Sequence, residues 1–330
     1  MLAYLVRRLI LAVLTLWAVS VLSFVVIQLP PGDYITSYIA QLSATGSFVS
    51  QQEAEALRQQ YGLDRPLHIQ YLRWMGMVLQ GRFGMALEWG RPVSEVIGDR
   101  LWLTMVVSIA AIVFTWLLAL PIGIYSAVRQ YSMGDYLATF LGFIGLAVPS
   151  FMLALILMYL GFTLFNANIG GLFSDEFSGA AWSLAKVWDL MKHLPLPALI
   201  LGLAGTAQLI RIMRANLLDE LSKPYVVTAR ARGLPETRVI LKYPVRVALN
   251  PFVSTIGYLL PYVVSGSIIV SLVLSLPTVG PLLLRALIAQ DMFLAGTIVL
   301  LLGVMTVIGT FLSDLLLIWI DPRIRFEGKP

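Results

Sequence analysis

The segment Lys223-Pro-Tyr-Val-Val-Thr-Ala-Arg-Ala-Arg-Gly-Leu-Pro-Glu-Thr-Arg238 separates two long apolar stretches of the chain. Pro224 suits the first turn of a helix, where its missing N–H is not needed. Gly233 can adopt the positive φ that ends such a helix. Pro235 then begins a second helix, and Glu236 lies beside the positive end of its dipole. The pattern predicts two short helices joined at a glycine.

The composition is that of a membrane protein without visible catalytic machinery. The 330 residues are 58% hydrophobic and 12% charged, with a mean hydropathy of +0.84, whereas a soluble domain carries roughly 25% charged residues. Cysteine is absent, which excludes disulfides, thiolate metal sites and Cys nucleophiles. His68 and His193 lie far apart, and no HExxH, P-loop or GxSxG motif occurs. We therefore expect neither an enzyme, nor a metal site, nor ATP hydrolysis by this chain itself.

Six stretches are long enough to cross the hydrocarbon core as helices, which takes about 20 apolar residues. They are approximately 9–29, 102–128, 137–165, 194–215, 252–274 and 292–318. The first is uncharged from Leu9 to Leu29, longer than the roughly 7–15 residues of a cleavable signal core. The sequence predicts an all-α polytopic protein in which this first helix is retained.

Charge predicts the orientation of the spans, because Lys and Arg are enriched in cytoplasmic loops. The loop 211–246 has eight basic and three acidic residues, and its side of the membrane totals about +8 with both termini included. The opposite segments, 30–100, 166–193 and 275–291, total about −2. Both termini and the basic loop are therefore expected in the cytoplasm. The net charge of +5 is explained by topology, so we expect no nucleic-acid partner.

The external segment 30–100 carries helix signals of its own. Ser50 and Glu53 match a capping box, and Gly62 can supply a left-handed cap. Asp64 is placed to cap a second helix. The expected helices are 50–61 and 66–79, the second ending at Gly81. Two interpretations stay open: a folded lid over the first two spans, or a docking surface for an external partner.

The second half of the charged loop also has a regular pattern. Arg238, Lys242 and Arg246 recur every four residues and would share one helix face beside the apolar residues Val239, Ile240, Tyr243 and Val247. Such a helix can lie on anionic lipid. It also has the outline of a DNA-binding helix-turn-helix, but both its ends are tethered to spans. For the shorter helix, 225–233, we favour a lever that docks into a cytosolic motor subunit.

The run Tyr225-Val-Val-Thr-Ala-Arg-Ala-Arg-Gly-Leu234 resembles the "EAA" coupling loop of ABC importer permeases, in the version of the oligopeptide/dipeptide/nickel branch. The resemblance covers nearly the whole chain. Further matching motifs are Pro31-Gly-Asp33, Tyr61-Gly-Leu-Asp-Arg-Pro-Leu67, Gly81-Arg-Phe-Gly84, Arg100-Leu-Trp-Leu-Thr104, Pro149-Ser-Phe151 and Asp321-Pro-Arg-Ile-Arg325. They occur in the family's order and at its spacing.

The resemblance implies the first of two permeases in a type I importer of six spans, in the inner membrane of a prokaryote. It implies a homologous second permease, two cytosolic ATP-binding subunits that hold ATP and Mg, and an external solute-binding protein. The chain itself would hold no cofactor and would contact membrane lipid. The implied organisation is a first span (1–29), the external helical segment (30–100), the permease core (101–322) with its coupling loop (211–250), and a cytoplasmic tail (323–330).

The resemblance also implies site residues. Tyr225 and Leu234 would pack in the coupling helix, Ala229 would permit close approach, and Gly233 would end the helix. The full coupling set is Tyr225, Thr228, Ala229, Arg230, Arg232, Gly233, Leu234 and Pro235. Residues of a gate or pore would be Pro149, Ser150, Phe151, Pro277, Gly280 and Asp314; residues of external docking would be Gly62, Leu63, Asp64 and Pro66. For Asp314, a structural pairing near the cytoplasmic end of its span competes with a gating role.

The cargo stays open between peptides and oligosaccharides. Ser271-Leu-Val-Leu-Ser-Leu-Pro-Thr278 replaces the Glu-x-Val-Phe-x-x-Pro-Gly that follows the fifth span in many family members. No acidic or His cluster in the spans suggests a path for nickel. An ion-coupled secondary transporter or a channel is the alternative class, but it would favour several buried ionisable residues and often an internal repeat.

Overall fold

The structure is a computed structural model that describes all residues except 1, 45–49, 167–168, 256–266 and 321–330. Two compact units divide the chain. Unit 1 comprises Met1–Thr104 and Thr278–Val304, and unit 2 comprises Met105–Pro277 and Met305–Pro330. Each unit is described by itself.

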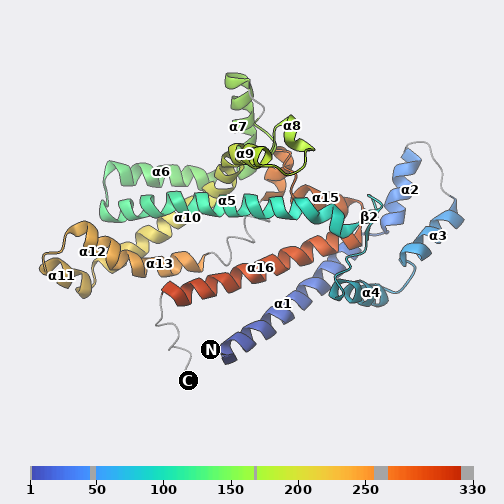
Figure 1. Ribbon diagram of the computed structural model, residues 1–330, viewed down its shortest axis with the longest axis horizontal. Helices are drawn as coiled ribbons and strands as arrows, with labels where there is room; N and C mark the ends of the chain where they lie inside the picture. The colour runs from blue at the N-terminus through green and yellow to red at the C-terminus, as the bar shows by residue number, and fades with distance from the viewer. Residues whose placement is uncertain (1, 45–49, 167–168, 256–266, 321–330) are drawn as a thin grey trace. The chain divides into compact units, whose positions relative to one another are not determined.

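Helices make up almost all the regular structure of the described residues (Figure 1). They are α1 Leu2–Gln28, α2 Tyr34–Ala44, α3 Gln51–Tyr61, α4 Leu67–Leu79, α5 Val93–Val128, α6 Met133–Ala147, α7 Ser150–Phe165, α8 Asp175–Ser178, α9 Leu184–His193, α10 Pro195–Leu221, α11 Pro224–Ala231, α12 Glu236–Lys242, α13 Pro244–Ser254, α15 Val279–Ile288 and α16 Met292–Ile320. The short strands β1 (Met85–Ala86) and β2 (Arg91–Pro92) pair antiparallel. The all-α prediction is confirmed apart from this hairpin.

Four helices in the described part of the chain are long and apolar enough to cross a membrane. They lie at Val6–Gln28, Val93–Val128, Pro195–Leu221 and Met292–Leu315. The helices α6 and α7 make a fifth span if a bent pair counts as one. Residues 256–266, in the middle of the predicted span 252–274, lie outside the described part.

The predicted span 137–165 is not one straight helix. Its two halves, α6 and α7, meet at a bend of 101°. Val148 is extended, with φ −87° and ψ 119°, because the ring of Pro149 disfavours the helical conformation of the residue before it. Helix α6 therefore ends at Ala147, and α7 begins afresh at Ser150.

In unit 1, the external segment is folded much as its caps predict. Ser50 and Glu53 form the capping box, and Gly62 ends α3 with φ +71°. Gly81 also adopts positive φ, +74°, just beyond α4. The expectation that Asp64 caps α4 is wrong: the helix begins one residue after Pro66, without a side-chain cap. The proline ring presets that helix start, so no side chain is needed there.

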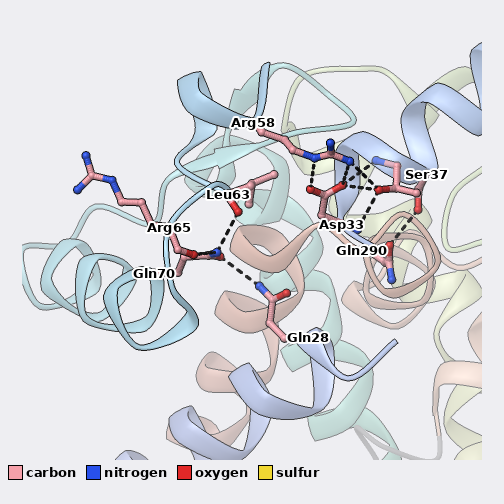
Figure 2. Close-up of polar contacts among 9 residues, drawn as sticks. Gln28, Asp33, Ser37, Arg58, Leu63, Arg65, Gln70 and Gln290 are labelled. Carbon is pink, nitrogen blue, oxygen red and sulfur yellow. Dashed lines mark hydrogen bonds and ion pairs between the residues drawn. The ribbon is translucent and has the colours of Figure 1, made fainter. Parts of the chain in front are cut away.

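Polar contacts tie this external segment together (Figure 2). Arg58 donates from Nε to Oδ2 of Asp33 at 2.7 Å and from Nη2 to the hydroxyl of Thr36 at 3.1 Å. Gln70 donates to the carbonyls of Leu63 and Arg65, at 3.2 and 2.7 Å. These hydrogen bonds add to an apolar cluster in which Tyr34 and Ile35 of α2 and Ala54 of α3 are buried.

The Asp33–Arg58 pair predicts a pH-dependent stabilisation. Burial raises the pKa of Asp33, but the hydrogen bonds from Arg58 and Thr36 outweigh it, and the pKa lies below its ordinary 3.8. A lowered pKa stabilises the fold above the ordinary value, and this contribution is lost as the pH falls through the folded-state pKa. We expect Asp33→Asn to cost less than about 1 kcal/mol near neutral pH, because the pair is partly exposed.

The measurement is limited proteolysis of the external segment at several pH values, with Asp64→Asn, an exposed aspartate nearby, as the control. The cleavage rates of the wild-type and Asp33→Asn proteins should differ at neutral pH and converge in strong acid. A difference that grows as the pH falls would contradict the assignment.

A buried carboxylate fixes the hairpin of unit 1. Asp291 is 0% exposed, caps α16 by accepting from Leu294 N at 3.1 Å, and accepts from Leu87 N at 2.6 Å. Burial raises its pKa to about 6. The hairpin that contains Leu87 is therefore attached to the first turn of α16, through a side chain 204 positions away in sequence.

In unit 2, α10 is the central helix. Gly123 of α5 lies so close to it that an added Cβ would come within 2.7 Å of the Met213 side chain. Arg214 donates from Nε and Nη2 to the two carboxylate oxygens of Asp135 at 3.0 and 2.9 Å. This bidentate ion pair joins α10 to the first turn of α6, and Asp135 is only 2% exposed.

Candidate functional site

The candidate coupling site starts where α10 ends. Lys223 is extended, with φ −71° and ψ 147°, and Pro224 occupies the first turn of α11 as predicted. The hydroxyl of Thr228 donates to the Pro224 carbonyl at 2.9 Å inside this helix. Figure 1 shows α11, α12 and α13 following one another beyond the end of α10. We call residues 224–243 the coupling hook.

Gly233 is the turning point of the hook. Its φ is +71°, and its N–H donates to the Arg230 carbonyl at 2.9 Å. An added Cβ would meet nothing within 4 Å. The position thus needs glycine for its backbone conformation and not for space. Arg232 is the C-cap of α11 and Pro235 the N-cap of α12, so the predicted helix, glycine, helix order is confirmed within one residue at each boundary.

The hook has a small core of its own. Val226, Ala229 and Val239 are 0%, 6% and 0% exposed, and Leu234 and Tyr243 pack against them. Because α11 and α12 bury apolar side chains against each other, the hook can move as one body. Val226 is the residue that the sequence reasoning missed. Its signal was available: Val226 and Ala229 are three apart and share a helix face.

The outer face of the hook is formed by exposed residues of α11 and its end. Tyr225 is 39% exposed and Val227 is 57% exposed. The expectation that Tyr225 packs inside the hook is therefore wrong. Its hydroxyl donates to Oε2 of Glu220 at 2.5 Å, and burial together with this bond raises its pKa. Thr228, Arg232 and Gly233 are also exposed. This face is available to another protein.

An ion pair closes the two arms of the hook. Arg230 donates from Nη2 to Oε1 of Glu236 at 2.7 Å, across the turn at Gly233. The hydrogen bond from Arg230 lowers the pKa of Glu236. The two side chains are 42% and 53% exposed, so solvent screens the attraction.

We expect Glu236→Gln to change the free energy of unfolding by less than about 1 kcal/mol, since exposed pairs contribute little. Thermal unfolding of the purified chain, followed by tryptophan fluorescence, measures it. Arg232→Gln, which removes a nearby exposed arginine, is the control. A loss of several kcal/mol would mean that the ion pair, and not the Val226–Val239 core, holds the hook closed.

The predicted stripe of three basic residues is not one helix face. Helix α12 ends at Lys242, and α13 begins at Pro244. Between them Tyr243 has φ −111° and ψ −78°, and Pro244, which has no N–H to donate, opens the next helix. Arg238 and Lys242 therefore lie on α12 and Arg246 on α13.

Helix α13 returns along α10 and holds the hook against the rest of unit 2. Phe252 is fully buried and meets the Trp116 ring edge-on at 4.8 Å between centroids. The cluster also contains Leu209, Ile210, Met213, Leu217, Ile240, Val245 and Ala248. It joins α10, α12 and α13 to α5, so the hook is packed against two long helices.

The other predicted site residues are dispersed. Pro149, Ser150 and Phe151 form the break between α6 and α7, where Phe151 is 40% exposed. Pro277 is exposed and belongs to unit 2, whereas Gly280 is buried in α15 of unit 1. Asp314 lies in α16, partly buried, next to Ser313, whose hydroxyl donates to the Val253 carbonyl at 3.2 Å. The motif 321–325 falls outside the described residues.

The predicted external docking residues stay together in unit 1. Gly62 and Leu63 close α3 with backbone bonds to the carbonyls of Gln59 and Arg58, at 3.1 and 2.8 Å. Asp64 and Pro66 are exposed in the turn that follows. The turn is thus rigid, and its outer side is open. Among the described residues, no group of three or more Asp, Glu or His side chains could hold a metal ion.

Two family models match the chain. Residues 119–326 match "binding-protein-dependent transport system inner membrane component", and residues 1–110 match the N-terminal region of such a membrane component. Full-length relatives agree. The oligopeptide transport permease AppB of Bacillus subtilis is 35% identical over 330 residues, covering 99% of this chain and 100% of its own length.

Two further relatives span the same length. A putative peptide permease of Brucella ovis is 36% identical over 329 residues, covering 98% of this chain and 99% of its own. The glutathione transport permease GsiC of Salmonella paratyphi A is 34% identical over 327 residues, covering 99% and 100%. These matches overturn the alternative of an ion-coupled transporter or a channel. The chain belongs to the binding-protein-dependent transport system inner membrane components, and it is a multi-pass permease subunit of an ABC importer, without catalysis or a cofactor of its own.

Proposed function

We propose that this chain is the first of two homologous permeases in an importer of short peptides, and that the coupling hook transmits ATP-driven closure of the motor subunits to the spans. The family implies ATP-binding subunits, a second permease and a binding protein. Here we assign two cytosolic ATP-binding subunits, which hold ATP and Mg, and a heterodimer of permeases. The observation that carries the proposal is the hook itself, a two-helix body with its own core, continuous with α10.

The route of transmission follows from the packing. A motor subunit that grips the exposed face of α11 would move α11 and α12 together, because Val226 and Val239 are fully buried between them. The α13 cluster would pass this displacement to α5 and α10. This is rigid-body movement of a packed element, which packed cores favour over gradual deformation.

The cargo assignment comes from the relatives. AppB is named for oligopeptides and GsiC for glutathione, a tripeptide, and each aligns over its whole length. Oligosaccharides have no such support, so we assign peptides. We also assign both termini to the cytoplasm on the charge distribution, which makes the hook cytoplasmic and the external segment 30–100 available to the binding protein.

Uptake by proteoliposomes is the test. The chain is co-purified with its partner permease and ATP-binding subunits, and uptake of a labelled tripeptide is followed with ATP inside and binding protein outside. We expect uptake that needs both, and competition by unlabelled peptides but not by a trisaccharide. Uptake without ATP, or competition by the trisaccharide alone, would refute the proposal. A fluorescent-protein fusion at the C-terminus, which fluoresces only in the cytoplasm, tests the orientation.

A further inference from the structure

Helix α9 (Leu184–His193) presents its polar and apolar faces in the reverse of the usual order. The residues Lys186 and Asp189 of this helix are buried, and each is only 7% exposed. Four large apolar side chains point outward: Leu184, 89% exposed; Val187, 44%; Trp188, 66%; and Met191, 56%. They recur at three- and four-residue spacing and so form one continuous face. We call these four residues the α9 apolar face.

The buried charges are fully accommodated by the loop before α9. Asp189 accepts hydrogen bonds from the N–H and the hydroxyl of Ser174, at 2.7 Å each. Lys186 donates to the Ala180 carbonyl at 2.6 Å, and its Nζ lies 4.9 Å from the centroid of the Phe173 ring. The inward position of these polar groups is therefore built into the fold, which orients the apolar face outward.

The position of α9 in the chain brings it to the edge of the membrane. Leu194 is at once the C-cap of α9 and the N-cap of α10, so no linker separates α9 from a membrane-spanning helix. The loop before α9 follows another apolar helix, α7, which ends at Phe165. Both ends of the segment 166–194 are thus attached to apolar helices.

The side chains at the end of α9 are those that favour a membrane surface. Lys192 places its Nζ 6.0 Å from the centroid of the Trp188 ring, so one residue pair offers an aromatic body and a cation. Tryptophan is enriched where spans meet the headgroups, and lysine can hold its charge in the polar layer while its stem lies among apolar groups.

We infer that α9 is an interfacial helix whose apolar face is embedded in the bilayer, at the level where α10 enters it. A helix that exposes leucine, valine, tryptophan and methionine while burying Lys186 and Asp189 is unfavourable against water and favourable against lipid. The bilayer then anchors the loop 169–194 and fixes the N-terminal end of α10, the helix whose other end carries the coupling hook. A protein partner on the same face is the competing occupant.

The absence of cysteine allows a direct test on the intact transporter. Leu184→Cys, Val187→Cys, Trp188→Cys and Met191→Cys are each spin-labelled in the complex, with partner subunits freed of cysteine, and reconstituted in lipid nanodiscs. Collision rates with oxygen, which concentrates in lipid, and with a water-soluble nickel chelate are measured by electron paramagnetic resonance. Glu176→Cys, an exposed position on α8, is the matched control.

We expect oxygen accessibility to exceed nickel accessibility severalfold at all four positions of the α9 apolar face, and the reverse at the control. Leu184 is so exposed that its substitution leaves the fold intact, which keeps the test valid if another variant fails. Nickel accessibility at the four positions would refute the inference. Low accessibility to both reagents would indicate that a protein covers the face. If this protection disappears when the binding protein is omitted, or persists without lipid, the inference is refuted as well.

Discussion

Replacing Arg214 by alanine is expected to destabilise the protein by about 3 kcal/mol, the lower end of the cost of breaking a buried ion pair. Asp135 would remain 2% exposed with its negative charge and without the bidentate guanidinium that now lies 2.9 and 3.0 Å away. The Tyr131 N–H, at 2.9 Å, would still donate to the carboxylate, but no positive charge would face it there. The lower end applies because the Arg214 side chain is 28% exposed and water can partly replace it.

Unfolding in mixed micelles with increasing SDS, followed by tryptophan fluorescence, gives the free energy. Arg211→Ala is the matched control, since Arg211 lies one turn earlier on α10 and is exposed. This substitution should change the free energy of unfolding by no more than about 0.5 kcal/mol. The double variant Asp135→Asn/Arg214→Gln should lose less than the two single variants added together, because no charge is then left unpaired. If Arg214→Ala had the same free energy of unfolding as the wild type, the pair would not hold α6 to α10.

This pair also marks the limit of prediction from sequence. Arg214 and Asp135 are 79 positions apart, so no pattern within a few residues links them. Several signals that act within a few residues were correctly interpreted. The capping box at Ser50 and the positive φ at Gly62 and Gly233 follow from local backbone chemistry, and the structure has them all.

The errors have local causes too, where two signals competed. Periodicity placed Arg238, Lys242 and Arg246 on one helix, but Pro244 interrupts it, because a proline inside a helix cannot donate the backbone hydrogen bond that would continue it. Around Pro149 the sequence predicted a single span, 137–165. The bend of 101° depends on how α6 and α7 pack, which no local signal contains.

Burial in the hook was the other unpredicted feature. The family resemblance implied that Tyr225 packs in the coupling helix, and it said nothing of Val226. The structure buries Val226 and turns Tyr225 to Glu220. Which of two adjacent residues faces inward depends on the angle between α11 and α12, and this angle is set at Gly233. The glycine is therefore the residue on which the assignment of the hook depends most.

Substituting Gly233 is expected to reduce transport in proportion to how poorly the new residue adopts a left-handed backbone. The φ of +71° costs an ordinary L-residue about 1–2 kcal/mol, less for asparagine and more for a β-branched residue. Because nothing lies within 4 Å of the added Cβ, this strain is not confounded by a clash. The series Gly233→Asn, Gly233→Ala and Gly233→Val should show a progressive loss of peptide uptake per ATP hydrolysed, about tenfold for alanine at a strain of about 1.4 kcal/mol and larger for valine.

Gly81→Val separates strain in the hook from strain in general. Gly81 has φ +74° and equally open surroundings, but it lies at the end of α4 in the external segment. Its substitution carries a similar backbone cost, so it should lower stability without changing the ratio of uptake to hydrolysis. If valine at the two positions altered that ratio equally, the effect would be loss of folding and not loss of coupling. If all three Gly233 variants kept the wild-type ratio, the hook would not transmit the motion, because its two arms could then change their angle without consequence for the spans.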